Sequence, residues 1–311
     1  MPYAGTLESA AEELAEAIER SVAVAVDGID RAAVAFSGGL DSSVLVCCAK
    51  KVTGVVACSA SVEGARDEEM AREAAAALGV QLVATRLTPE SVSQELGAIK
   101  LPFEPSVMDA SLWCLYSIVA RSASSAGAKA ILLGQLADEL FGGYSKYRRA
   151  LAEGGEEKAA QMMMQDVEGY AGRGRARDTG ACSRWLSPRF PFESREVVQL
   201  GLALPVSYRV GGDLSKPVLR KAAVILGVPS ELTSAPKKAA QYSSGVQKLV
   251  ARTSLFNARR ATRHHDSIAT AQREAGGVQA TAGEVQLLRP GRRNGSGRQA
   301  GSGEGIQAAE S

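Results

Sequence analysis

The chain has 311 residues, of which 45% are hydrophobic and 23% charged, and its formal net charge is +2. A chain of this length and composition can bury a full core, so we expect a globular protein with one large domain, or one domain with a helical subdomain. The positive charge belongs to the last part of the chain, because residues 251–311 carry nine Arg against five acids whereas residues 1–250 are slightly acidic.

The cysteines and histidines exclude several kinds of site. The five cysteines show neither CxxC nor Cys/His spacing, which argues against a zinc site and against a secreted disulfide framework. Both histidines, His264 and His265, lie near the end of the chain. Catalytic triads of the Ser/His type and His-ligated metals are therefore excluded from residues 1–250.

The hydropathy pattern gives no sign of a membrane or export segment. No apolar run approaches the roughly 20 residues that a bilayer span needs, and the acidic N-terminus lacks the basic region of a signal peptide. We expect a cytoplasmic protein without a membrane partner.

Residues 7–20 form the first predicted element, an amphipathic helix with small apolar residues on one face and glutamates elsewhere. Apolar runs and helical stretches then alternate, a pattern typical of a parallel sheet covered by helices on both faces. Strands are predicted at 32–36, 54–60, 80–87 and 130–134, and helices at 41–50, at 67–78, from the third strand through 126, and at 138–150.

From about residue 145 the strand signals stop and helical patterns dominate through 250, with breaks at 171–191 and 205–217. The fold class is therefore α/β, a twisted parallel sheet followed by a mostly helical C-terminal lobe and a disordered basic tail. We expect an N-terminal helix in residues 1–30, a core in 31–150, the helical lobe in 151–265 and the tail in 266–311. Arg292 and Arg293 fit a solvated tail better than a nucleic-acid contact.

The segment SGGLDSS, residues 37–43, joins the first predicted strand directly to a helix. Ligands of parallel α/β sheets bind where strands end, and the free N–H groups at the start of a helix bind anions. Ser37 begins this turn, and Gly38 and Gly39 let the backbone approach a phosphate closely. Ser42 and Ser43 add hydroxyl donors in the first helical turn.

Asp41 in the same turn suggests a metal ion, because a carboxylate beside polyphosphate is repulsive unless a divalent cation lies between them. The simpler alternative is an ordinary Ser/Gly turn, but strand, SGGLDSS and helix in immediate succession favour the phosphate site. The chain has no GxxxxGK[ST] loop of the Walker type. SGGLDSS resembles the pyrophosphate loop of the ATP pyrophosphatase superfamily, whose members cleave ATP between the α and β phosphates and adenylate a substrate. The resemblance implies an adenine nucleotide alpha hydrolase-like fold, with ATP and Mg²⁺ as cofactors.

A second motif, LLGQLADELFGGYSKYRR at residues 132–149, follows the fourth predicted strand. A switch-point arrangement would bring Asp138 beside Asp41 at one Mg²⁺, although adjacent acids can also simply complement a helix dipole. The segment resembles G-x-G-x-D-E-x-F-G-G-Y of the synthase domain of asparagine synthetases. By that resemblance Asp138 assists metal and pyrophosphate binding, and Glu139 positions or deprotonates the attacking amine.

A third match, residues 214–246, resembles the family's K-x-x-L-R pattern and the catalytic lysine before its Q-F-S-x-G-V stretch. A fixed ammonium near the α-phosphate would offset the charge that builds during adenylation. The segment is one residue longer than the pattern, so both Lys237 and Lys238 remain candidates for that lysine. A solvated lysine pair is the alternative.

Smaller matches extend the resemblance over residues 30 to about 250. The end of the second strand lies where the family holds adenine, and Asp178 has the spacing of the acid in the family's D-R-x-x-M stretch. In SPRFPFES, residues 187–194, Ser187 and Ser194 replace acids of a region that lines the acceptor side of the pocket in the family. That change puts aspartate in doubt as the substrate.

The resemblance implies an AMP-forming amide ligase that adenylates a carboxylate, with aspartate the first candidate, and amidates it with ammonia. No N-terminal glutaminase domain fits before Ser37, so we expect the ammonia to come from solution or from a separate glutaminase subunit. The alternatives are a related enzyme acting on another acid or on tRNA, and a non-catalytic nucleotide-binding homologue. The sequence leaves the oligomeric state open, with a homodimer as one assembly to test.

Overall fold

The computed structural model describes residues 3–211, 215–234 and 244–253, and every structural statement below refers to these residues. They all belong to one compact unit, residues 1–260. The tail predicted for 266–311 lies outside the described residues, and the predicted domain boundaries stay predictions. Within the described ranges no helix has both the length and the apolar character that a bilayer crossing demands.

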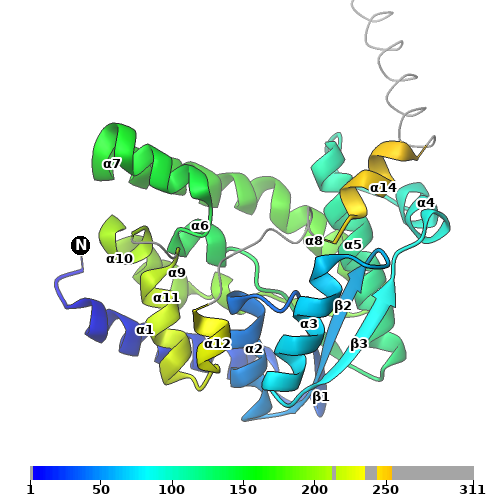
Figure 1. Cartoon of the computed structure of the whole chain (residues 1–311), viewed down its shortest axis with the longest axis horizontal. Helices are drawn as coiled ribbons and strands as arrows, with labels where there is room; N and C mark the ends of the chain where they lie inside the picture. Colours follow the sequence, from blue (N-terminus) through cyan, green and yellow to red (C-terminus); the bar gives the residue numbers. More distant parts are fainter. Residues whose placement is uncertain (1–2, 212–214, 235–243, 254–311) are drawn as a thin grey trace, which may run out of the picture. The chain divides into compact units, whose positions relative to one another are not determined.

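A five-stranded parallel sheet forms the centre of the unit, in the order β3-β2-β1-β4-β5. The central strand β1 pairs with β2 on one side and with β4 on the other, so that Ala33 lies between Val56 and Ile131. Figure 1 shows β1, β2 and β3 as adjacent arrows covered by helices. The strands are β1 Arg31–Ala35, β2 Gly54–Ser61, β3 Gln81–Arg86, β4 Ala130–Leu132 and β5 Ser187–Arg189.

The two faces of the sheet are buried under two separate helix layers, as the unbroken apolar strands predict. Side chains alternate along β1, so Ala32 and Val34 pack into one hydrophobic cluster while Ala33 packs into the other. The first layer contains α1 Leu7–Ala25, α2 Leu40–Lys50 and α3 Arg66–Ala77. The second contains α4 Pro89–Gly97, α5 Val107–Ser125, α8 Arg175–Cys182 and α14 Val246–Arg252.

The predicted amphipathic N-terminal helix is confirmed and is longer than expected, because α1 continues to Ala25. Its small buried residues, among them Ala10, Leu14 and Ile18, let α1 pack closely against α2 and α11. The predicted helical lobe is also confirmed. The remaining helical elements are α6 Ala137–Phe141, α7 Ser145–Gly169, the π-helix η1 Tyr170–Gly174, the 3₁₀ turn η2 Pro191–Glu193, α9 Arg195–Ala203, α10 Val206–Arg209, α11 Pro217–Ile225 and α12 Ser230–Thr233.

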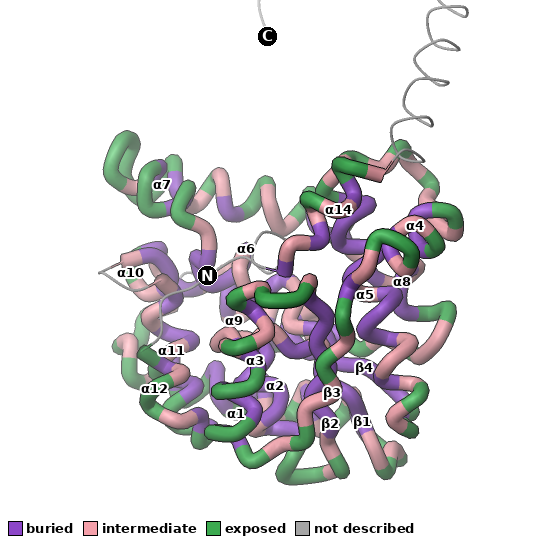
Figure 2. Tube along the Cα trace, turned by 45° about the vertical axis from the view of Figure 1, so that its right-hand side comes forward, coloured by how far each residue is buried: buried purple, intermediate pink, exposed green. Residues whose placement is uncertain are grey.

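Helix α7 is a hairpin of two helical arms. Gly154 and Gly155 have non-helical backbone angles in its middle. Lys146 in the first arm contacts Asp166 in the second at 2.6 Å, although a straight helix of 20 residues would separate them by about 30 Å. Figure 2 shows much of the outer surface of α7 as exposed, in contrast to the buried strands of the sheet.

Two features within residues 171–191 differ from the sequence prediction. The expected break at 171–191 is helical as far as Cys182, through η1 and α8. Strand β5 was not expected, because it has three residues and contains Pro188, which suits only an edge strand. It pairs with β4 alone.

Candidate functional site

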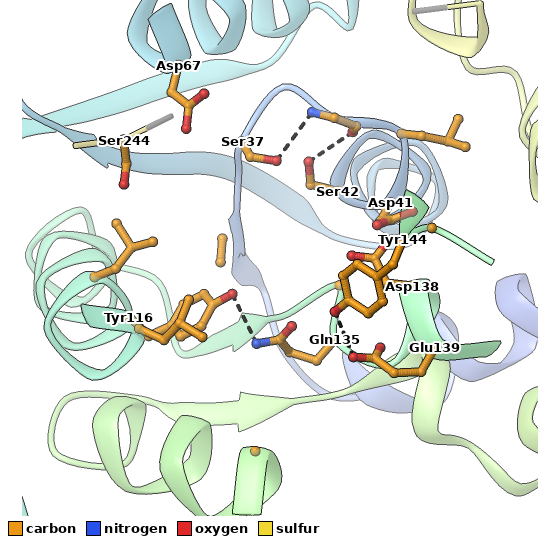
Figure 3. A pocket seen from close by; sticks show the side chains of 18 of the residues that line it. Ser37, Asp41, Ser42, Asp67, Tyr116, Gln135, Asp138, Glu139, Tyr144 and Ser244 are labelled. Carbon is orange, nitrogen blue, oxygen red and sulfur yellow. Dashed lines mark hydrogen bonds between the residues drawn. The ribbon is translucent and has the colours of Figure 1, made fainter. Parts of the chain in front are cut away.

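A cavity of about 990 Å³ lies at the carboxyl edge of the sheet, where β1, β2 and β4 end. Its wall continues through the start of α2, one face of α5, the segment from β4 to α7, the region around η1 and the start of α11. The site therefore lies at the switch point of the strand order, where ligands of parallel α/β sheets bind. Figure 3 shows labelled side chains from the start of α2, from α5 and from the segment between β4 and α7 around the cavity.

The SGGLDSS turn has the strained geometry that its glycines predict. Gly38 has φ +74°, and a Cβ atom there would lie 2.7 Å from the Met70 carbonyl oxygen. Gly39 caps α2, its N–H donates to Ser37 Oγ at 3.4 Å, and its carbonyl accepts the hydroxyl of Ser42 at 3.1 Å. All of these residues line the cavity, so a bend beside the start of α2 is open to an anion.

Asp41 and Asp138 come together on one cation, the side chain of Lys216. The Lys216 Nζ atom lies 2.5 Å from Asp41 Oδ1 and 2.5 Å from Asp138 Oδ1. The lysine is 2% exposed. Burial lowers its pKa, but the two carboxylates outweigh burial and raise the pKa above the ordinary value, so Lys216 is charged.

Close backbone packing holds this group together. A Cβ atom on Gly143 would collide with Asp138 Oδ1 and would lie 2.6 Å from Lys216 Cε. Lys216 itself has φ +63°, a left-handed conformation that is unusual for a residue with a side chain. Strain of this kind collects at functional sites, and here the ammonium contacts acids in α2 and α6, the helices that follow β1 and β4.

Glu139 is a buried carboxylate beside this group. It accepts a hydrogen bond from the Tyr144 hydroxyl at 2.8 Å (Figure 3). Burial and the neighbouring charge of Asp138 raise the pKa of Glu139 above its ordinary value. A carboxylate with a raised pKa on a cavity wall is suited to accepting a proton near neutral pH.

The opposite wall carries a buried ionic network between α5 and α8. Arg177 donates to both oxygens of Asp178, from Nε at 2.7 Å and from Nη2 at 3.1 Å, and its Nη1 donates to Asp109 Oδ1 at 3.1 Å. Asp109 also completes the capping box of α5 with Ser106. From this network Asp178 reaches the cavity wall through Gln135, whose Nε2 donates to Asp178 Oδ2 at 2.5 Å.

Three sequence predictions differ from or fall outside this geometry. Ser43 is fully buried, donates its hydroxyl to the Gly39 carbonyl and is not a cavity-lining residue, so its position does not support a phosphate contact. Lys237 and Lys238 lie outside the described residues. Ser187 and Ser194, which were expected on the acceptor side, do not line the cavity either, because one lies in edge strand β5 and the other caps α9.

Asp41 and Asp138 fit a Mg²⁺ ion that would take its other ligands from phosphate oxygens and water. Asp41 and Asp138 direct one oxygen each at a single cationic atom, so they are close enough to share one metal ion. No group of three ligating side chains occurs in the part of the chain that the structure describes. Magnesium sites of this type use one or two carboxylates and complete the shell with phosphate oxygens and water.

The asparagine synthase family model matches residues 13–186 and 153–277, which together include both motifs and Lys216. The chain belongs to the asparagine synthase family. In this family's G-x-G-x-D-E segment the second glycine corresponds to Leu136 here. The structure keeps the glycine-like conformation at that position, with φ +72° for Leu136.

Among curated proteins, the chain is 27% identical over 276 residues to the "Putative asparagine synthetase (glutamine-hydrolyzing) 1" of Methanocaldococcus jannaschii, covering 78% of this chain and 51% of that protein. It is 36% identical over 120 residues to asparagine synthetase (glutamine-hydrolyzing) 1 of Bacillus subtilis, covering 38% of this chain and 19% of that protein. The chain thus spans about half the length, or less, of these relatives. NMN synthetase from Francisella tularensis is a distant structural likeness, with a TM-score of 0.41 and 10% identity over 79% of this chain and 85% of its own.

Sequence reasoning did not anticipate the positions of Lys216 and Gln135 on the cavity wall. Lys216 is the lysine of the K-x-x-L-R pattern, so the signal was present, but nothing in one sequence says that this side chain turns back toward Asp41. Gln135 gave no signal, because it occupies a variable position of its motif.

Proposed function

We propose that this protein is an ATP-dependent, AMP-forming amide ligase of the asparagine synthetase type. The observation that carries the proposal is the convergence of Asp41 and Asp138 on Lys216 beside a glycine-rich turn at the switch point of the sheet. That arrangement suits the triphosphate of ATP better than a neutral ligand, because an anion with a divalent cation complements two acids, a lysine and a helix N-terminus.

In the first step an oxygen of the substrate carboxylate attacks the α-phosphorus of ATP. The bond between that phosphorus and the bridging oxygen to the β-phosphate breaks, which gives an acyl adenylate and pyrophosphate. Ser37, Gly38, Gly39 and Ser42 would hold the departing phosphates, and Lys216 would offset their charge. Lys237 or Lys238 stays our candidate for the second ammonium at the α-phosphate.

Asp41 and Asp138 would hold Mg²⁺, which supplies charge neutralisation to the phosphate oxygens when it is bound. The protein's own contribution is to hold these two carboxylates close together beside the SGGLDSS turn. Gly143 is essential to this part, because any side chain there would enter the space of Asp138.

In the second step ammonia attacks the acyl carbon, the bond between that carbon and the AMP oxygen breaks, and the nitrogen loses a proton. Glu139 would accept that proton, since burial raises its pKa. Tyr144 would keep the carboxylate oriented through its hydrogen bond. Aspartate is the first acid to test, and free ammonia or a separate glutaminase is the proposed nitrogen source.

The test is pyrophosphate exchange into ATP, measured for a panel of amino acids with and without ammonium. We expect one acid to support exchange without ammonium and to give AMP and an amide only when ammonium is added. Asp41→Asn, which removes one carboxylate of the proposed metal pair, should lose most of the exchange activity. Equal exchange by the variant and the parent protein would contradict the catalytic assignment.

A further inference from the structure

Gln135 lies on the cavity wall between the Asp138–Glu139 turn and Tyr116 on α5 (Figure 3). It follows β4 directly, in the same segment as the acids of the proposed metal site. Its side-chain nitrogen Nε2 donates to the Tyr116 hydroxyl at 3.0 Å and to Asp178 Oδ2 at 2.5 Å. Both hydrogens of the amide nitrogen are therefore used inside the protein.

The orientation of this amide is forced by Asp178. Burial raises the pKa of Asp178, whereas Arg177, which contacts both of its oxygens in a fork, and the Gln135 amide oppose that rise and stabilise the ionised carboxylate. An ionised carboxylate only accepts hydrogen bonds, so Gln135 must turn its nitrogen toward Asp178 and its oxygen the other way. Figure 3 shows the amide oxygen turned away from the Tyr116 hydroxyl.

The oxygen Oε1 of Gln135 is thus presented to the cavity as a hydrogen-bond acceptor. Within the described residues it receives no hydrogen bond. The buried Asp109–Arg177–Asp178 network holds it from behind, so binding a ligand there costs little ordering of the side chain. An acceptor fixed in this way favours a group that donates a hydrogen bond, through N–H or O–H, and disfavours a second carboxylate.

We infer that Gln135 binds a primary amine nitrogen in the acceptor half of the cavity, an inference that rests on the proposed function. Two nitrogens in the reaction have this chemistry. One is the amino group of the acid that is adenylated, which would make the substrate an amino acid. The other is the ammonia that attacks the adenylate.

Two variants separate binding from a structural role. Gln135→Met keeps the length of the side chain but has neither donor nor acceptor. Gln135→Glu keeps an acceptor oxygen but loses the N–H donors to Tyr116 and Asp178. Gln94→Met, an exposed glutamine on α4, is the matched control. Thermal melting and ATP binding of all three proteins check that they fold.

The two half-reactions then identify the ligand. If Gln135 binds the amino group of the acid, Gln135→Met raises KM for the acid about tenfold in ammonium-free exchange, the effect expected for a lost hydrogen bond to a charged group. If it binds ammonia, exchange is unchanged and KM for ammonium rises by a similar factor during amide formation. In either case Gln135→Glu keeps a KM closer to that of the parent protein.

The inference is overturned if both variants leave both KM values unchanged. It is also overturned if both variants lower kcat and melting temperature equally without a change in either KM, since that pattern shows only structural support for Asp178. A parent protein without exchange for any acid would instead remove the proposed function, and this inference with it.

Discussion

Lys216 and Asp138 form an ion pair at the cavity wall, with Nζ 2.5 Å from Oδ1, the lysine side chain 2% exposed and the aspartate side chain 21% exposed. Because the same nitrogen contacts Asp41 at the same distance, one ammonium compensates two carboxylates. The stability of the protein should therefore depend on Lys216.

Replacing Lys216 by Met should destabilise the protein by about 3 kcal/mol, since it removes a buried cation that contacts both Asp41 and Asp138. The measurement is urea unfolding followed by circular dichroism. Magnesium should recover part of the loss in Lys216→Met, because an ion that binds only the native state stabilises it.

Lys221→Met on the same helix is the control for this change. Lys221 pairs with Glu8 at an exposed position, so its loss should cost less than about 1 kcal/mol. Equal destabilisation by the two substitutions would mean that the buried pair contributes nothing beyond a surface contact.

Glu139→Gln should make the protein more stable at pH 7 while abolishing amide formation. The pKa of Glu139 is raised in the folded protein, so the folded state loses stability as pH rises from the unfolded value near 4.5 through the folded pKa. The uncharged glutamine removes that loss. The gain in melting temperature over the parent protein should shrink toward zero as pH falls to about 4.5, and a gain that is constant across pH would exclude ionisation as its cause.

At position 136 the glycine variant should be more stable than the alanine variant, which is the reverse of the usual order. Its backbone is left-handed, with φ +72°, a conformation that costs a residue with a Cβ atom roughly 1–2 kcal/mol and glycine almost nothing. Both small substitutions lose the buried leucine side chain, but Leu136→Gly should be more stable than Leu136→Ala by about 1 kcal/mol. Denaturant unfolding of both variants measures the difference.

Leu140 supplies the matched pair of variants. It is fully buried in α6. There the alanine variant should be more stable to unfolding than the glycine variant by about 0.5–1 kcal/mol. The same order at both positions would contradict strain at Leu136.

Much of the fold follows from local pattern, whereas the site depends on contacts between distant residues. The apolar runs that become β1, β2, β3 and β4 each end in a turn signal and alternate with amphipathic stretches, so sheet and layers were predictable. Strand β5 was not, since three residues with a proline carry no period. The helical stretch across η1 and α8 was not predicted, because glycines such as Gly172 and Gly180 usually disfavour a helix.

The positions of Asp41, Asp138 and Glu139 on the cavity wall were predictable, because each follows a strand within a specific motif. Lys216 was not assigned a role, because its approach to Asp41 spans 175 residues and relies on a left-handed turn before α11. The orientation of Gln135 is likewise set by Asp178, which reaches it from another helix.

The late position of Lys216 in the chain has a consequence for biosynthesis. A nascent chain that has left the ribosome only as far as α6 already contains Asp41 and Asp138, the acids of the proposed metal site, but it lacks the Lys216 ammonium that contacts both of them. The contacts that join these acids to Lys216 can therefore form only after the start of α11 has been translated, so the proposed site cannot be completed from its N-terminal half alone.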